Sequence, residues 1–425
     1  MEAIQLKRNL FYKGSLLLLY FLAVASIFSP IRTIKNFNFI WAISIIAWFA
    51  FSILDNPGYF SKPSIHRFLI YVYLMYTISI AYIMENGVIG NRFFELAQVP
   101  LFYLAYHKNS INGYGRDNRT FIILTIPFVI LSIILTITAY SLDPLNQYIS
   151  RGVKAGTELG IEYMKRGIGG YELIYFLLIL FPVLLYIVFE TPHLFKLKFR
   201  FVGLLLIVLF AVNILLSNYS IASFLLIFCV LYIAIIPKLN VRLAPLFLII
   251  LCVLVIFSTQ IFSGFVNSLE ILFGNTLNAE RLKEVNDFFA SNKMGDSFAA
   301  RISTYENSLN AFYDNPLFGL ITQPVVYSGN YLVGFGQHSQ ILDTFALFGF
   351  GIGALQLYIY FQPITIKIRN NNWILSSLAL LVLIIFFILI LVNNVTPSTG
   401  FAVFFIFPTA YDWIQEKLSE YENLS

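Results

Sequence analysis

Long apolar runs separated by short polar segments make up most of this chain. A run of about 20 apolar residues is long enough to cross the roughly 30 Å hydrocarbon core of a bilayer as a helix. The pattern predicts twelve such spans, near residues 14–30, 38–54, 67–84, 87–106, 120–141, 171–190, 200–217, 219–236, 243–263, 340–361, 373–392 and 399–415. The tight link at Ser217-Asn218 is the weakest of these boundaries. We therefore expect an all-α polytopic membrane protein.

The basic residues between the spans predict the orientation of the helices. Cytoplasmic loops of membrane proteins carry an excess of Lys and Arg. If the N-terminus is cytoplasmic, the short loops on the opposite side contain only two basic residues, Arg32 and Lys35. The cytoplasmic segments then hold Lys7, Arg8, Lys13, Lys62, Arg67, Lys108, Arg116, Arg119, Lys196, Lys198, Arg200, Lys238, Arg242, Lys367 and Arg369. This distribution supports twelve helices with both termini in the cytoplasm.

Composition strengthens the membrane assignment and excludes other classes. The 425 residues are 59% hydrophobic and 12% charged, whereas a soluble domain carries about 25% charged residues. The net charge of +5 is spread over loops, so it is not the basic patch of a nucleic-acid-binding protein. The first apolar run has no small-residue cleavage site, which favours a retained helix over a signal peptide. Cys229 and Cys252 both fall in apolar runs, which indicates buried thiols rather than a disulfide or metal site. We expect residues 1–425 to form a single integral membrane domain.

The predicted topology leaves two long segments outside, near residues 142–170 and 264–340. Long loops carry function more often than short ones. In the first, Arg151 and Arg166 are candidates for binding an anion. Lys154, Glu158, Glu162 and Arg166 follow one another at the ion-pairing interval of four residues, so this segment also fits a plain solvated helix.

The second long segment contains two predicted amphipathic helices, of the kind that lie at a membrane interface. The first carries Arg281. The second carries Arg301, one position away from an apolar stripe made by Phe298, Ile302, Tyr305, Leu309 and Phe312. Asp296 or Ser297 is placed to cap its start, and Asn315-Pro316 should end it because a residue before proline avoids the α region.

One predicted span, 87–106, contains charged residues. Arg92 adjoins a polar face formed by Asn91, Glu95 and Gln98 at helical spacing. A charge at mid-membrane costs roughly 2.5–3.5 kcal/mol on the lenient scale, so Arg92 should face protein or a wet cavity. Two interpretations stay open. Arg92 and Glu95 either form a pair that fixes helix packing, or line a cavity where Arg92 meets phosphate or sugar.

His338 lies just before the tenth predicted span and differs from the other three histidines, which lie at cytoplasmic ends. An external imidazole that titrates near neutrality can accept a proton from a sugar hydroxyl, although a lone histidine is more often structural. Gln340, Asp343 and Thr344 share a face of the following helix. Asp343 is also favoured there by the helix dipole alone. Glycines at 349, 351 and 353 should permit close packing and carry no chemistry.

Taken together, residues 301–353 resemble the bacterial O-antigen polymerase and O-antigen ligase superfamily. The features that carry the resemblance are an arginine-bearing helix, the Asn-Pro-Leu-Phe-Gly sequence at 315–319, Gln337-His338-Ser339, and Asp343 with the glycines of the next span. The hydropathy layout is similar over the whole length. The ligase pattern typically has His-Asn where this chain has His338-Ser339, which favours a polymerase.

The resemblance implies a GT-C-like glycosyltransferase on the outer face of the bacterial cytoplasmic (inner) membrane. It would join undecaprenyl-diphosphate-linked oligosaccharide repeat units into O-antigen or capsule polysaccharide, inverting the anomeric carbon without a metal or other cofactor. Partners would be the lipid-linked substrate, membrane lipid, a flippase and a chain-length regulator.

The same resemblance implies roles for the candidate residues. Arg301, with Arg281 or Arg166, would hold the diphosphate, and His338 would act as general base or orient the acceptor. Glu95 and Asp343 are alternative bases, and Arg151, Arg92 and Tyr305 are further substrate contacts. Two alternatives remain: a ligase that transfers the glycan to another acceptor, and a flippase, which should show internal repeats.

Overall fold

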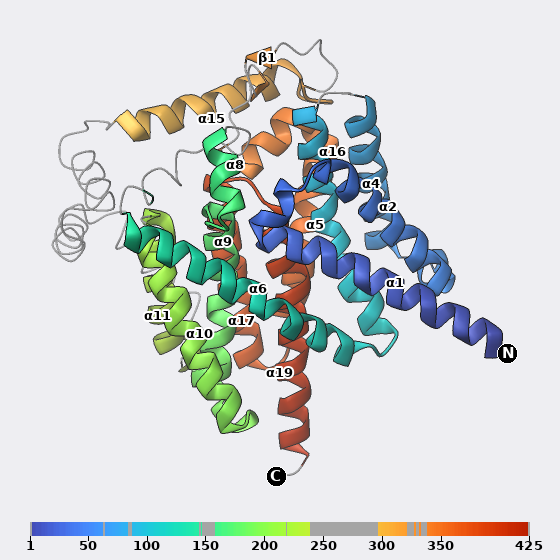
Figure 1. The fold of residues 1–425 in the computed structure, drawn as a ribbon, viewed down its shortest axis with the longest axis vertical. Coiled ribbons are helices and arrows are strands. Elements are labelled where there is room, and N and C mark those ends of the chain that lie inside the picture. The colour runs from blue at the N-terminus through green and yellow to red at the C-terminus, as the bar shows by residue number, and fades with distance from the viewer. Residues whose placement is uncertain are drawn as a thin grey trace. The chain divides into compact units, whose positions relative to one another are not determined.

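A computed structural model describes residues 2–62, 64–83, 87–143, 146, 158–217, 219–238, 296–320, 327–328, 331–332 and 338–423. Helices make up nearly all of this part of the chain (Figure 1). The strands in it are two residues long, β1 (Tyr327–Ser328) and β2 (Tyr331–Leu332), and they pair in an antiparallel ladder. The predicted all-α class is confirmed.

Eight helices within these ranges are long and apolar enough to cross a membrane, and all eight lie where the apolar runs predicted them. They are Leu10–Ile27, Phe37–Asp55, Gly115–Leu142, Tyr171–Glu190, Leu197–Leu216, Ile221–Lys238, Gln340–Ile368 and Trp373–Val392. This chain is therefore a polytopic membrane protein.

The other four predicted spans have different outcomes. Helices cover three of them: α4 (Ile65–Ile83), α5 (Gly87–Ile111), and the run of α18 (Pro397–Phe401), η6 (Ala402–Ile406) and α19 (Phe407–Glu422). These three do not belong to the eight helices above. The predicted span 243–263 lies outside the described residues. The count of twelve and the orientation of the termini stay predictions.

The surface of α10 (Leu197–Leu216) shows why these helices need lipid. Phe201, Leu205 and Val208 are 60%, 54% and 55% exposed. Large apolar side chains repeated along one helix face in water would be an aggregation surface. In hydrocarbon they are at no disadvantage, and the helix satisfies its own backbone groups.

The described chain divides into two compact units. The first comprises Met1–Val183, Ala354–Lys367 and Val395–Ser425. Besides α4, α5, α18, η6, α19 and the second part of α16 (Gln340–Ile368), it contains α1 (Glu2–Ile27), η1 (Ser29–Thr33), α2 (Phe37–Asp55), α3 (Pro57–Ser61), α6 (Gly115–Leu142), α8 (Glu158–Lys165) and most of α9 (Tyr171–Leu185).

An aromatic cluster at the centre of this first unit surrounds Phe401 on α18. Its ring centroid lies 5.0 Å from that of Phe102 on α5 and 6.3 Å from that of Phe176 on α9. The rings of Phe121 and Phe405 lie 4.9 Å apart beside it. Neighbouring Gly400 packs against Val99, because a Cβ at Gly400 would lie 2.9 Å from the Val99 side chain. A small residue at this position therefore lets α18 approach α5.

The second unit comprises Leu184–Gly353 and Ile368–Asn394. It contains the end of α9, η2 (Tyr186–Glu190), η3 (Pro192–Leu194), α10, α11 (Ser220–Ile235), η4 (Ile236–Lys238), α15 (Asp296–Asp314), β1, β2, the first part of α16, and α17 (Trp373–Val392).

Ser377 on α17 joins three helical segments in the interior of the second unit. Its hydroxyl lies 2.7 Å from the Tyr186 hydroxyl, and its backbone oxygen accepts from the Tyr232 hydroxyl at 3.1 Å. Cys229 is buried and forms no disulfide, as predicted. Cys252 lies outside the described residues.

The first unit also contains a buried ion pair. Lys108 Nζ on α5 lies 2.9 Å from Asp55 Oδ2 on α2, and the two side chains are 2% and 7% exposed. We expect Lys108→Met to lower the free energy of unfolding by about 3–5 kcal/mol, because it leaves the Asp55 charge buried without its partner. The thermal unfolding midpoint of the purified protein measures this.

A double substitution, Asp55→Leu with Lys108→Met, is the control for that prediction. Replacing both members of a buried pair with apolar residues is often neutral or stabilising. The double variant should therefore recover most of the lost stability. If it unfolds at the temperature of Lys108→Met or lower, the pair is not what holds α2 to α5.

Candidate functional site

The helix that carries Arg301 is anchored to the first turn of α16 by a buried hydrogen bond. Ser308 Oγ on α15 donates to Asp343 Oδ1 at 2.7 Å, and both residues are 1% exposed. Figure 1 shows α15 running across the direction of α10 and α11 rather than along it. A helix in this orientation at the end of membrane spans is typical of an interfacial helix.

The buried face of α15 differs from the predicted apolar stripe. Ser308 and Ala311 are buried, whereas Leu309, which we placed in the stripe, is 37% exposed. The predicted stripe is therefore wrong at Leu309, because the pattern weighed large apolar residues and ignored small ones, which bury more easily beside another backbone. Ile302 and Phe312 are half-buried. Tyr305 is half-buried on the same face.

The turn after α15 packs backbone to backbone against α16. The helix ends at Asp314, as Asn315-Pro316 predicted. Phe350 N then donates to the Pro316 carbonyl oxygen at 2.7 Å. A Cβ at Gly319 would lie 2.2 Å from the Leu347 oxygen, and one at Gly349 would lie 2.4 Å from the Leu317 carbonyl. We call residues 315–319 and Gly349 the glycine clamp.

Gly349 also breaks α16. Its φ of 66° and ψ of −169° are non-helical, so Gln340–Ile368 is two helices joined at this residue. Discontinuous membrane helices are typical of sites that bind polar ligands, because the break frees backbone groups. The prediction that the three glycines merely permit helix packing is wrong for Gly349, whose neighbour is a turn rather than another span.

His338 is exposed and lies two residues before this broken helix. The residues that follow it are buried, beginning with Ser339 and Gln340. Gln340 Nε2 donates to Thr344 Oγ1 at 2.9 Å, which confirms the predicted polar face with Asp343. Gln340 N also donates to the Asn393 carbonyl oxygen at 3.2 Å. This hydrogen bond therefore fixes the backbone on the C-terminal side of His338.

The first unit contains a charged cluster that was not predicted from the sequence. Arg32 on η1 pairs with Glu172 on α9 at 2.6 Å and donates through Nε to the Ala25 oxygen at 2.8 Å. Burial disfavours the charge on Arg32, but the carboxylates of Glu172 and Glu95 outweigh it, so the pKa of the guanidinium is raised. Ser398 Oγ donates to the backbone oxygen of Glu172 at 3.1 Å.

Two signals in the sequence pointed to this cluster. Arg32 is one of two basic residues on the short loops predicted to be external, and Glu172 begins an otherwise apolar span. Each is a charge at a place where lone charges are rare. Their partnership could not be foreseen, because 139 intervening residues separate them.

The remaining candidates divide into those that are placed and those that are not. Arg166 follows α8 and pairs with Glu162 at 3.8 Å, with side chains 51% and 61% exposed, as the ion-pairing interval predicted. Arg151 and Arg281 lie outside the described residues. Arg92 belongs to α5 and Arg301 to α15, but their side chains lie outside the described part of the structure. Within the described ranges, no three His, Cys, Asp or Glu side chains are grouped to hold a metal ion.

The second unit thus brings His338, Asp343 and the Arg301-bearing helix to one place. The histidine and the aspartate flank the start of a broken membrane helix, and a hydrogen bond and the glycine clamp hold α15 against it. Such an arrangement can bind an anion at an arginine and accept a proton at an imidazole. Comparison of the chain with protein-family models, curated proteins and solved structures finds no match.

Proposed function

We propose that this protein is a membrane glycosyltransferase that polymerises lipid-linked oligosaccharide repeat units on the outer face of the bacterial cytoplasmic membrane. The observation that carries the proposal is the anchoring of α15 to the broken helix α16 beside an exposed histidine. The resemblance of residues 301–353 to O-antigen polymerases and ligases supports it.

The chemistry requires stabilisation of a leaving group and removal of one proton. The acceptor hydroxyl oxygen attacks the anomeric carbon, and the bond from that carbon to the undecaprenyl diphosphate oxygen breaks. Negative charge grows on the diphosphate, so a guanidinium that binds it more tightly in the transition state accelerates the reaction. The proposal assigns this role to Arg301, and assigns removal of the hydroxyl proton to His338.

Fixed placement of the helix is what makes this assignment chemically useful. Hydrogen-bond donors stabilise a developing charge best when they already point at it and need not move during the reaction. The Ser308–Asp343 hydrogen bond is buried, and leaving one of its two groups without a partner would cost about 1–3 kcal/mol. In this proposal Asp343 positions α15, and its carboxylate is committed to Ser308 instead of acting as the base.

Reconstitution tests the proposal. The full-length protein would be placed in liposomes with a purified undecaprenyl-diphosphate-linked repeat unit, and products would be separated by size. A ladder of multiples of the repeat unit is the result we expect. Folded protein that yields no product, alone or with a candidate acceptor, would contradict a transferase.

The two alternatives give different results in the same system. A ligase yields a single transfer, and only when a separate lipid or protein acceptor is supplied. A flippase moves the labelled substrate from the inner to the outer leaflet without changing its size. Deletion in the cell separates them too: loss of a polymerase leaves single repeat units on the surface, and loss of a ligase leaves lipid-linked polymer.

A further inference from the structure

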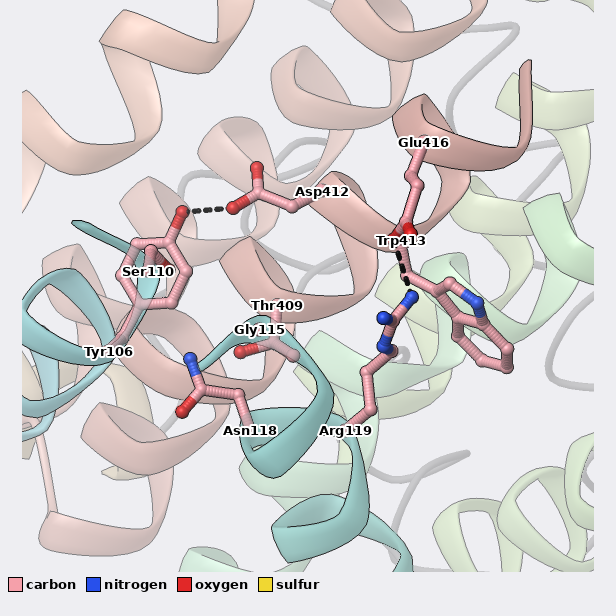
Figure 2. Close-up of a pocket in the computed structure, with 9 residues that line it drawn as sticks. All are labelled: Tyr106, Ser110, Gly115, Asn118, Arg119, Thr409, Asp412, Trp413 and Glu416. Atoms are coloured by element: carbon pink, nitrogen blue, oxygen red, sulfur yellow. Dashed lines mark hydrogen bonds and ion pairs between the residues drawn. The ribbon is translucent and has the colours of Figure 1, made fainter. Parts of the chain in front are cut away.

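A small pocket opens in the first unit between the ends of α5, α6 and α19 (Figure 2). Nine residues line it: Tyr106, Ser110, Gly115, Asn118, Arg119, Thr409, Asp412, Trp413 and Glu416. Its volume is about 40 Å³. Because a water needs roughly 10–15 Å³, the pocket has room for about three water-sized groups and is too small for a sugar ring. The pocket is therefore distinct from the proposed glycan site.

Asn118 presents a buried donor to this pocket. Its side chain is 1% exposed, and its Oδ1 accepts from Asn109 Nδ2 at 2.8 Å. Its Nδ2 is buried and has no hydrogen-bond partner among the described residues. Figure 2 shows this nitrogen directed into the space between Tyr106 and Thr409. A buried amide N–H left without an acceptor costs about 1–3 kcal/mol, so this position calls for one.

Two further positive features lie on the same side of the pocket. The pocket is lined by Gly115 and Arg119 from the first turns of α6, a helix of 28 residues whose N-cap residue, Tyr114, makes no capping side-chain hydrogen bond. The N-terminus of a long helix carries partial positive charge and favours anions. Arg119 uses Nη1 to bind Glu416 at 2.5 Å, which leaves its other N–H groups for a ligand.

The two carboxylates in the lining already have cationic partners. Asp412 accepts from the Tyr106 hydroxyl at 2.5 Å and pairs with Lys367, and Glu416 pairs with Arg119. Their charges are therefore largely neutralised. The helix terminus and the Asn118 N–H remain, and both favour an acceptor with negative charge. We propose that this pocket binds a phosphate group, whose oxygens match its volume and whose charge matches its donors.

The chemistry of a phosphate group fits two sources. One is free phosphate, and the other is the headgroup of an anionic phospholipid. The predicted topology puts this end of the helices at the cytoplasmic face, where basic pockets between helices bind lipid headgroups. Trp413 lines the pocket, and tryptophan is enriched at the membrane–water boundary. An occupant would tie α19 to α5 and α6.

Thermal unfolding of the full-length protein in a maltoside detergent tests the proposal. The probes are sodium phosphate, phosphatidylglycerol and, as a phosphate-free lipid, dioleoylglycerol, with ionic strength matched by sodium chloride. Phosphate or phosphatidylglycerol should raise the unfolding midpoint of the wild-type protein, because a ligand that binds only the folded state stabilises it. Dioleoylglycerol and sodium chloride should not. Whichever phosphate-bearing probe acts at lower concentration identifies the source.

Asn118→Asp and Asn112→Asp form a matched pair for this test. The first replaces the unpartnered donor with a carboxylate and should weaken phosphate binding at least tenfold. The second adds the same charge nearby, where Asn112 Oδ1 accepts from Asn56 Nδ2 at 2.7 Å outside the pocket, and should bind as the wild type does. Equal responses in the wild type and both variants, or no response of the wild type to either probe, would overturn the proposal.

A second variant covers the case in which Asn118→Asp fails to fold. Arg119 is at the rim, with its side chain 25% exposed, so Arg119→Gln should fold. It removes a charged donor and should also weaken phosphate binding about tenfold or more. Unchanged affinity in Arg119→Gln would show that the pocket does not hold the anion.

Discussion

Gly349→Ala is expected to lower the stability of the second unit by about 3 kcal/mol or more and to release α15. The φ and ψ of Gly349, 66° and −169°, lie in a region that essentially only glycine adopts. A Cβ there would also lie 2.4 Å from both the carbonyl carbon and the oxygen of Leu317. Because these are backbone atoms, no side-chain movement relieves the clash. The unfolding midpoint and the rate of proteolysis within α15 measure the effect.

Gly351→Ala is the matched control, two residues along the same helix. A Cβ at Gly351 would meet nothing within 4 Å. Alanine is favoured over glycine inside a helix by roughly 0.5–1 kcal/mol, so this variant should be as stable as the wild type or slightly more so. If Gly349→Ala and Gly351→Ala behave alike, α16 is not broken at Gly349 and the glycine clamp does not exist.

The contrast between these glycines shows where prediction of the fold from sequence stopped. Apolar runs of span length predicted the helices well, because the hydrocarbon core sets both their length and their composition. The same pattern shows three glycines at alternate positions and cannot show which one leaves the helix. That depends on the turn after α15, where the backbone atoms of Leu317 and Phe318 occupy the space that a side chain at 349 would need.

The candidate site, too, could be predicted only in part from the sequence. His338 stood out because it is the one histidine of the sequence on the predicted external side, and Asp343 because it shares a helix face with Gln340 and Thr344 just inside the predicted outer boundary. The partner of Asp343, Ser308, was missed because a serine that follows Glu306 and Asn307 gives no signal of burial. Its hydrogen bond to Asp343 fixes the rotation of α15, and hence which of its positions face inward.

Arg301→Ala is expected to reduce polymer formation about 1,000-fold while leaving the protein folded in the membrane. Removing one preorganised donor from an oxyanion site typically costs 100- to 1,000-fold, and a guanidinium bound to a diphosphate offers two donors and a full charge. Arg301→Lys should retain part of the activity, because lysine keeps the charge but not the paired geometry. Product formation by reconstituted protein, at equal amounts of folded enzyme, measures both.

Glu306→Ala provides the control on the same helix. Glu306 is exposed and lies on the opposite side of α15 from Ser308, so its loss should change product formation by less than about twofold. The comparison separates an effect of the charge at 301 from a general effect on α15, since the two substitutions lie five residues apart. Polymer of normal length and amount from Arg301→Ala would show that the diphosphate does not bind at this helix. Arg166 and Arg32 would then be the described arginines left to test on the predicted external side, with Arg32 already held by Glu172.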